Sequence, residues 1–197
     1  MQEKSERRSN VARSEATRGL LIAAARALFS EKGYAETSTP EIVRAAGTTR
    51  GALYHHFADK AALFRAVLEQ EYAAVEAEIT QAAVSEPRGT VEALVEGGRG
   101  YLAAMQGPGR VRLMLLDGPA VLGRAALDEI DRRTSADSLR LGLEAAMAEG
   151  DIRTLPLGPL TAVLSSMFER AALDVAEGAA PDDQLAVFEA IFRGLAP

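Results

Sequence analysis

Apolar residues recur every three or four positions along most of this 197-residue chain, which is the spacing of amphipathic helices. Segments rich in glycine and proline separate these stretches, and no stretch shows the sustained alternation of apolar and polar residues that marks a β-strand. No apolar run approaches the ~20 residues of a membrane-spanning helix, and the N-terminus has no hydrophobic signal segment. The pattern predicts an all-α protein of about nine helices without a membrane partner.

The first part of the chain predicts four helices with clear start and stop signals. Glycine readily takes the left-handed conformation that ends a helix, so Gly33 and Gly47 are expected to close the first two. Thr39 can accept from free backbone amides as an N-cap, and Pro40 suits the first helical position. The expected helices span residues 14–32, 40–46, 50–57 and 59–84, with Thr48 or Thr49 capping the third and Asp59 capping the fourth.

The third predicted helix presents a face that suits a groove lined with phosphates. At ~100° per residue, Leu53 and Phe57 fall on one side and would anchor the helix, whereas Gly51, Tyr54 and His55 fall broadly opposite. Tyrosine and nearby arginine can bond phosphate oxygens or base edges, and glycine removes a steric obstacle. Two short helices joined by a glycine-centred turn, with such a face, are typical of a helix-turn-helix DNA-binding motif.

Residues 33–64 read GYAETSTPEIVRAAGTTRGALYHHFADKAALF, with a Gly-Tyr turn, an Ala-Gly turn and a Leu-Tyr pair in the third helix. On these residues, the segment from Thr17 to Leu68 resembles the DNA-binding domain of the TetR family of transcriptional repressors. The resemblance implies a double-stranded DNA operator as partner. Carried over residue by residue, the family's DNA contacts fall on Thr39, Thr48, Thr49, Arg50, Gly51, Tyr54, His55, His56 and Lys60. Thr48 departs from the family pattern, which usually has an apolar residue there.

The charge distribution supports this interpretation although the whole chain carries a formal charge of -6. Residues 1–65 hold eleven Lys and Arg against seven Asp and Glu, a net charge of +4, so the remainder carries -10. A positive end would face phosphates while the acidic bulk stays away from them. Residues 1–13 have almost nothing to bury, so we expect a disordered arm that either reaches DNA or is a solvated tail. Residues 14–60 would form the DNA-binding domain and residues 61–197 a helical ligand-binding and dimerisation domain.

Five further helices are expected downstream, at residues 90–106, at 110–116, from the break at 117–119 to 149, at 159–177 and at 182–195. The last two have broad apolar faces, which would be buried either within the monomer or against a second copy. Helix-turn-helix proteins read two half-sites as symmetric dimers, and two helix hairpins can form a four-helix bundle, so we favour a homodimer. The candidate dimerisation residues are Leu160, Val163, Leu164, Met167, Phe168, Leu185, Phe188, Ile191, Phe192 and Leu195.

The TetR resemblance also implies a pocket for a small-molecule effector among helices four to seven. Its candidate lining residues have adaptable or amphipathic side chains, although each could equally be an ordinary core residue. These candidates are Phe64, Tyr72, Tyr101, Met105, Met114, Leu115 and Leu127. Arg110, Arg112 and Arg124 could pair with an anionic ligand or with nearby carboxylates.

The expected function is therefore a cytoplasmic, ligand-responsive repressor that binds a palindromic operator as a homodimer and is released by a small molecule. A ligand-independent architectural DNA-binding protein is one alternative, and it would bind with little sequence preference. A helical enzyme is another. The chain has no cysteine, no phosphate-binding loop and no histidine outside the third helix, so we expect no catalytic site, cofactor or metal.

Overall fold

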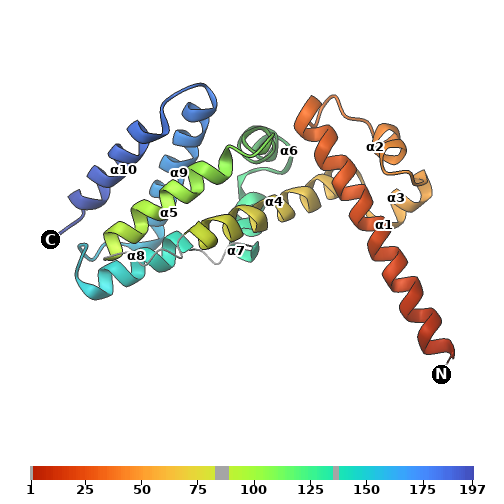
Figure 1. The fold of residues 1–197 in the computed structure, drawn as a ribbon, viewed down its shortest axis with the longest axis horizontal. Coiled ribbons are helices and arrows are strands. Elements are labelled where there is room, and N and C mark those ends of the chain that lie inside the picture. Colours follow the sequence, from red (N-terminus) through yellow and green to blue (C-terminus); the bar gives the residue numbers. More distant parts are fainter. Residues whose placement is uncertain (1, 83–88, 135–137) are drawn as a thin grey trace.

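The computed structural model describes residues 2–82, 89–134 and 138–197, and within these ranges it contains helices and loops but no strand (Figure 1). Ten α-helices and one π-helical segment, η1, take the place of the nine or so helices predicted. The all-α fold class is confirmed. The elements are α1 (Gln2–Lys32), α2 (Thr39–Ala45), α3 (Arg50–His56), α4 (Lys60–Ala82), α5 (Thr90–Met105), η1 (Val111–Asp117), α6 (Gly118–Leu122), α7 (Arg124–Thr134), α8 (Ser138–Glu149), α9 (Leu157–Ala176) and α10 (Pro181–Gly194).

The first helix begins much earlier than expected. α1 is helical from Gln2, where the sequence predicted a disordered arm over residues 1–13 and a helix from residue 14. Residues 2–18 contain neither glycine nor proline and are rich in Gln, Glu, Lys and Arg, which favour helix. The low hydrophobicity of these residues argues against their burial in a core. It does not prevent α1 from extending beyond the core as an exposed helix.

The long helix expected up to residue 149 is divided into three. α6 ends at Gly123, whose φ of +79° is a left-handed conformation that a helix cannot continue through, and α7 follows at once. α7 ends before residues 135–137, which lie outside the described ranges, and α8 begins after them. The predicted end at Gly150 is confirmed, since that residue has a φ of +80°. The predicted end of the fourth helix at residue 84 also lies outside the described residues.

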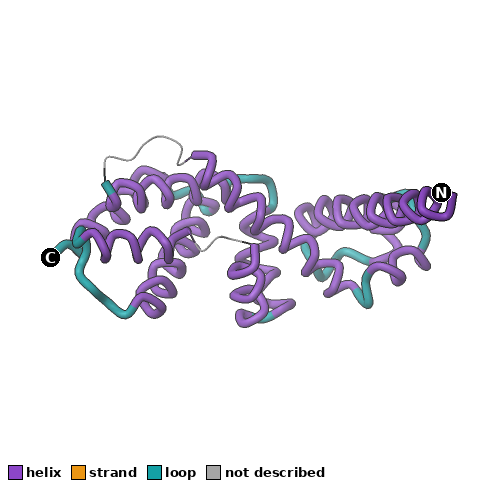
Figure 2. Tube along the Cα trace, turned by 90° about the horizontal axis from the view of Figure 1, so that it is seen from below, coloured by secondary structure: helices purple, strands orange, loops and turns teal. Residues whose placement is uncertain are grey.

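The helices form two groups joined by α4. α1 to α3 lie together at one end, and α5, α8, α9 and α10 lie together at the other (Figure 1). A view turned by 90° shows the same separation (Figure 2). We call the first group the reading head and everything after α4 the regulatory part. α4 packs against α1 of the reading head and against α5 and α7 of the regulatory part, so one rigid element contacts both.

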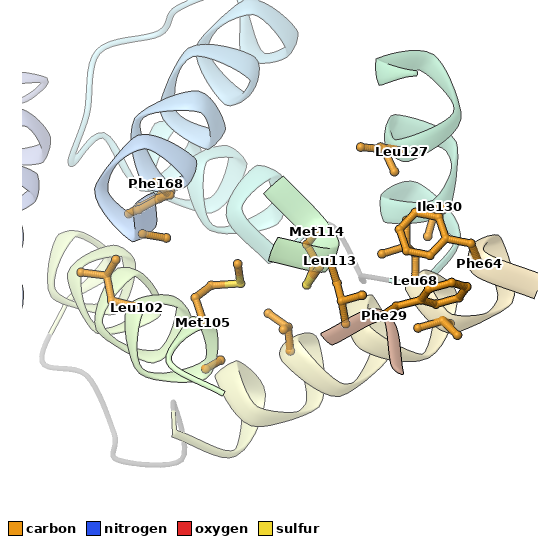
Figure 3. Close-up of a cluster of buried hydrophobic side chains, with 14 of the residues drawn as sticks. Phe29, Phe64, Leu68, Leu102, Met105, Leu113, Met114, Leu127, Ile130 and Phe168 are labelled. Carbon is orange, nitrogen blue, oxygen red and sulfur yellow. The ribbon is translucent and has the colours of Figure 1, made fainter. Parts of the chain in front are cut away.

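One hydrophobic core runs through both groups. Phe29 of α1 and Phe64 of α4 meet edge to face, with ring centroids 5.2 Å apart. Figure 3 shows buried side chains continuing from this pair, through Leu113 and Met114 of η1, towards Phe168 of α9. In the regulatory part, Phe168 packs so closely on α5 that a Cβ added at Gly98 would lie 2.7 Å from its ring. No described helix is both long enough and apolar enough to cross a membrane.

A buried ion network joins the reading head to the regulatory part. The Glu71 carboxylate of α4 accepts from the Arg26 Nε of α1 at 2.6 Å and from the Arg110 Nε at 3.1 Å. Glu71 is only 4% exposed and Arg110 only 9%. Arg110 also donates to both carboxylate oxygens of Glu78, at 2.8 and 2.7 Å. Burial of these charges is tolerable because each has opposite charges within hydrogen-bond distance.

Candidate nucleic-acid interface

The start of α2 is fixed by a capping box. The N-cap is Ser38, one residue before the predicted Thr39, and the Glu41 carboxylate accepts from its backbone amide at 3.0 Å and from its hydroxyl at 2.8 Å. The Lys32 ammonium donates to the other Glu41 oxygen at 2.8 Å, and this bond is the main reason that the pKa of Glu41 falls to about 2. The capping box and this ion pair together tie the start of α2 to the end of α1.

The turn between α2 and α3 follows the sequence prediction. Gly47 has a φ of +61°, and the Thr48 amide donates back to the Val43 carbonyl at 3.1 Å. Of the two threonines considered as the cap of α3, it is Thr49 whose hydroxyl accepts from the Ala52 amide, at 3.1 Å. Thr48 is half-buried in the turn and Thr49 is exposed.

The two sides of α3 are separated as predicted. Leu53 is completely buried and Phe57, at its C-cap, is 5% exposed, so both anchor the helix in the core of the reading head. Arg50, Gly51, Tyr54 and His55 are exposed. A Cβ added at Gly51 would touch nothing closer than the Thr49 hydroxyl at 3.9 Å, so another molecule can approach the backbone there. We call the exposed side of α3, formed by these four residues, the reading face.

Three of the predicted DNA-contact residues are brought together by side-chain contacts. The Arg50 guanidinium lies 5.6 Å from the centroid of the Tyr54 ring. Hydrogen bonds from Thr39 and then from Arg50 lower the pKa of Tyr54. Tyr54 nonetheless keeps 44% of its surface exposed. The phenol therefore interacts both with Thr39 of α2 and with Arg50 of its own helix, and no sequence pattern predicts the interaction with Thr39.

A shallow hollow separates α3 from the N-terminal part of α1. It is lined by Arg13, Ser14 and Thr17 of α1 and by Gly51, Ala52, His55 and His56 of α3. The His55 and His56 rings stand edge to face with centroids 5.2 Å apart. In the described part of the chain, no group of three metal-ligand side chains is placed to hold an ion.

Lys60, one of the predicted DNA contacts, has two backbone partners within the protein. Its ammonium donates to the carbonyls of Tyr34 and Thr37, at 2.8 and 2.9 Å, and lies 4.1 Å from the centroid of the Tyr34 ring. Two of its three donors thus fix the loop between α1 and α2, and one is left for an outside partner. These loop carbonyls lie 23 and 26 residues away along the chain, so no local sequence pattern predicts them as partners.

The predicted dimerisation residues separate onto two faces of the α9–α10 hairpin. Five of them are at most 7% exposed within the protomer, and these inward residues are unavailable to a partner: Leu164, Phe168, Leu185, Phe188 and Phe192. Val163 and Ile191 are 67% and 37% exposed, and Leu160, Met167 and Leu195 are half-buried. Val187, which we did not predict, is 52% exposed beside them. The outward stripe therefore consists of Leu160, Val163, Met167, Val187, Ile191 and Leu195.

The predicted pocket residues are dispersed through the core. Phe64, Met105, Met114 and Leu127 are at most 3% exposed. Phe64 lies beside Phe29, on the opposite side of η1 from Met105 (Figure 3). Met105 lines a hollow between the C-terminal ends of α5 and α9. Leu115 is partly buried and packs against the core.

The tyrosines of the predicted pocket have a less ordinary environment. Burial raises the pKa of Tyr72 and of Tyr101, and the nearby carboxylates Asp131 and Glu169 raise both further. Within the described residues, neither phenol has a hydrogen-bond partner. Two of the arginines predicted to pair with an anionic ligand or with nearby carboxylates are bound to carboxylates. Arg110 belongs to the buried ion network, and Arg124 forms a bidentate pair with Glu169 at 3.1 and 2.7 Å.

Comparisons with known proteins agree on one family. The model of bacterial regulatory proteins of the tetR family matches residues 21–67, and the model of the tetracyclin repressor-like C-terminal domain matches residues 91–196. The structure of a TetR-family transcriptional regulator from Pectobacterium atrosepticum is similar over 94% of this chain and 96% of its own, with 33% identity and a TM-score of 0.73.

Curated relatives match mainly at the reading head. The HTH-type transcriptional regulator AcrR of Shigella flexneri is 46% identical over 56 residues, which are 28% of this chain and 26% of that protein. The A-factor receptor protein of Streptomyces griseus is 34% identical over 87 residues, which are 44% of this chain and 29% of the receptor. The chain thus spans less than a third of either relative.

Proposed function

Because the chain belongs to the TetR family of bacterial transcriptional regulators, we propose that it is a repressor that binds a palindromic operator as a homodimer and is released by a small molecule. The observation that carries this proposal is the reading face of α3, where Arg50, Gly51, Tyr54 and His55 are exposed on a helix anchored by buried Leu53. A short helix of this kind fits the major groove of B-DNA.

The contacts divide by chemistry. Arg50 and His55 carry donors suited to base edges, and Gly51 allows the backbone to come close. Four hydroxyls, one imidazole and one ammonium would bind phosphate and set the register. They belong to Thr39, Thr48, Thr49, Tyr54, His56 and Lys60. The net charge of +4 on residues 1–65, against -10 on the rest, supports an orientation with the reading head on the DNA.

Selection of bound duplexes from a random DNA pool tests this function directly. We expect an inverted repeat with half-site centres ~34–36 Å apart, because each reading head occupies one major groove on the same side of the duplex. An architectural DNA-binding protein would instead enrich no sequence and would lose affinity steeply with salt. Recovery of no preferred sequence would therefore contradict the proposal.

Loss of the reading-face arginine should weaken operator binding without unfolding the protein. Arg50 is exposed and touches only the surface of Tyr54, so Arg50→Ala is expected to reduce operator affinity by about ten- to a hundredfold while the unfolding temperature stays nearly constant. Fluorescence anisotropy with the selected duplex and thermal unfolding followed by circular dichroism measure the two quantities. Arg99→Ala, an exposed arginine of α5, is the matched control. Normal binding by Arg50→Ala would refute the assignment of the reading face.

The outward stripe of α9 and α10 supports the homodimer. It consists of three apolar side chains on α9 and three on α10 or its C-cap that are exposed or half-buried, and two such helix pairs related by a two-fold axis would form a four-helix bundle. The symmetry of this bundle would also place two reading heads for two half-sites of an inverted repeat.

A charge in the middle of the outward stripe should separate the subunits. Val163→Asp would bury one carboxylate per subunit in an apolar interface, so the dimer dissociation constant is expected to rise by at least about a hundredfold. Sedimentation equilibrium over a range of concentrations measures it. Leu141→Asp, at a position of α8 that is 48% exposed, is the control for an added surface charge and should remain dimeric. An unchanged dimer in Val163→Asp would place the interface elsewhere.

Release by a small molecule requires a ligand that prefers a non-binding conformation of the protein. α4 supports this part of the proposal because it packs against α1 of the reading head, carries Tyr72 itself and packs against α5, which carries Tyr101. A tilt of α4 would move the two heads out of register with their half-sites. Unchanged operator affinity at saturation with a ligand shown to occupy this region would contradict the mechanism.

A further inference from the structure

Two side chains of η1 reach across to the junction of α1 and α2. The Arg112 guanidinium donates through Nη1 to the carbonyl of Glu31 at 3.0 Å, and an Asp117 carboxylate oxygen accepts from the amide of Tyr34 at 2.8 Å. The Glu31 carbonyl belongs to the last turn of α1, where carbonyls have no partner within the helix. η1 thus supplies partners for a backbone acceptor and a backbone donor that flank Gly33, and the loop to α2 leaves from this point.

The π-helical form of η1 is what places both side chains on the same side. Residues 112 and 117 are five apart, and five steps of an α-helix leave two side chains ~140° apart. A π-helix closes its hydrogen bonds between residues five apart, so such residues lie roughly one turn apart on one side. Leu113 and Met114, between them, are at most 3% exposed and belong to the hydrophobic core. η1 therefore holds the core with one side and the reading head with the other.

We propose that Arg112 and Asp117 are positioning residues that set the orientation of the reading head relative to the regulatory part, and that the π-helical form of η1 permits both contacts at once. The proposal rests on the DNA-binding function proposed above. The turn at Gly33 leads directly into α2, and Thr39 of α2 is close enough to the Tyr54 phenol to lower its pKa. A change of direction at Gly33 is therefore passed on to the reading face.

The same geometry gives the regulatory part a way to act on the head. Long π-helical runs are rare, so the α-helical form is the second state that the proposal assigns to η1. That conversion would leave the Asp117 and Arg112 side chains ~140° apart around the helix axis, so one of the two contacts with the head would break. Met114 is a buried residue of η1 between Arg112 and Asp117. A molecule that takes its place in the core and binds better to the α-helical form of η1 would favour the conversion.

Variants of the two residues test the proposal on the operator recovered by selection. Asp117→Ala and Arg112→Ala are each expected to lower operator affinity about tenfold, and each should also reduce the penalty for lengthening the half-site spacing by one base pair. Asp117→Asn keeps an acceptor oxygen and should bind like the wild type. Leu116→Ala, at an exposed position of the same segment, is the matched control. A merely structural role would lower stability but would leave the spacing preference intact.

A second measurement needs neither DNA nor a dimer. The sequence has no cysteine, so Ala58→Cys on the reading head and Leu141→Cys on α8 can carry two spin labels in one chain, diluted into unlabelled protein. The distance distribution should be narrow in the parent and clearly broader with Asp117→Ala or Arg112→Ala. Unchanged distributions together with unchanged spacing preference would overturn the proposal. If Asp117→Ala fails to fold, the Arg112→Ala variant tests the proposal by itself, because Arg112 is exposed and its loss should not unfold the protein. If the wild type selects no sequence, the DNA-binding function fails, and the distance measurement alone decides the positioning role.

Discussion

Replacing Glu71 with alanine should destabilise the protein by about 3–5 kcal/mol, because it would leave the buried guanidinium of Arg110 without its buried carboxylate partner. Arg110 would keep Glu78, but the Glu78 side chain is 49% exposed and lies in a more polar environment. Arg26 would lose its two hydrogen bonds to the α4 carboxylate, so the contact between α1 and α4 would weaken as well. Urea unfolding followed by circular dichroism measures the free energy of unfolding.

A matched control separates the effect of burial from the loss of any ion pair. Glu144→Ala removes a carboxylate that is 59% exposed and paired with Arg140 one helical turn away, and it should cost less than about 0.5 kcal/mol. The double variant Glu71→Leu with Arg110→Met should recover much of the stability lost in Glu71→Ala, since apolar groups of similar size leave no buried charge. A double variant less stable than Glu71→Ala would show that the network itself, rather than the orphaned charge, stabilises the junction.

Truncation of Leu53 is expected to have the second large effect, about 2–5 kcal/mol of stability. Leu53 is the buried anchor of a helix of only seven residues, and its side chain packs fully inside the reading head. A cavity there cannot be filled by rotation of α3 without turning the reading face. Operator affinity should therefore fall together with stability, whereas Arg50→Ala should lower affinity alone.

The two effects can be measured on the same samples. Thermal unfolding and anisotropy titrations of Leu53→Ala should both shift, with the titration performed well below the lowered unfolding temperature. Ala58→Gly, at an exposed position just after α3, controls for changes in backbone flexibility near the motif. A fully stable Leu53→Ala would mean that α3 is held mainly by its caps and by Phe57.

Local signals explain why the reading head could be predicted so closely from sequence. The positive φ of Gly47, the cap formed by Thr49 and the burial of Leu53 opposite Tyr54 each depend on residues within one turn of each other. The N-cap of α2 was misplaced by one residue because Ser38 and Thr39 are both good caps, and only the bond from Ser38 to Glu41 distinguishes them.

Contacts between distant residues could not be predicted in the same way. Glu71 occurs on the apolar side of α4, which indicates that it is buried, but nothing in the sequence identifies Arg26 or Arg110 as its partners. The broad apolar faces of α9 and α10 were assigned to a partner because periodicity alone does not show which stripe meets α5. Packing of Phe168 and Phe188 against Gly98 settles that question for the inward side.

The protein has four tyrosines and no tryptophan, so its near-ultraviolet absorbance and its fluorescence come mainly from tyrosine. Tyr54 lies on the reading face with a lowered pKa, while Tyr34, Tyr72 and Tyr101 have raised pKa values. Absorbance in an alkaline titration should therefore record ionisation at the reading face before ionisation in the regulatory part. Tyrosine emission, undisturbed by energy transfer to indole, can likewise register changes around Tyr54 on the reading face and around Tyr72 and Tyr101 in the unmodified molecule.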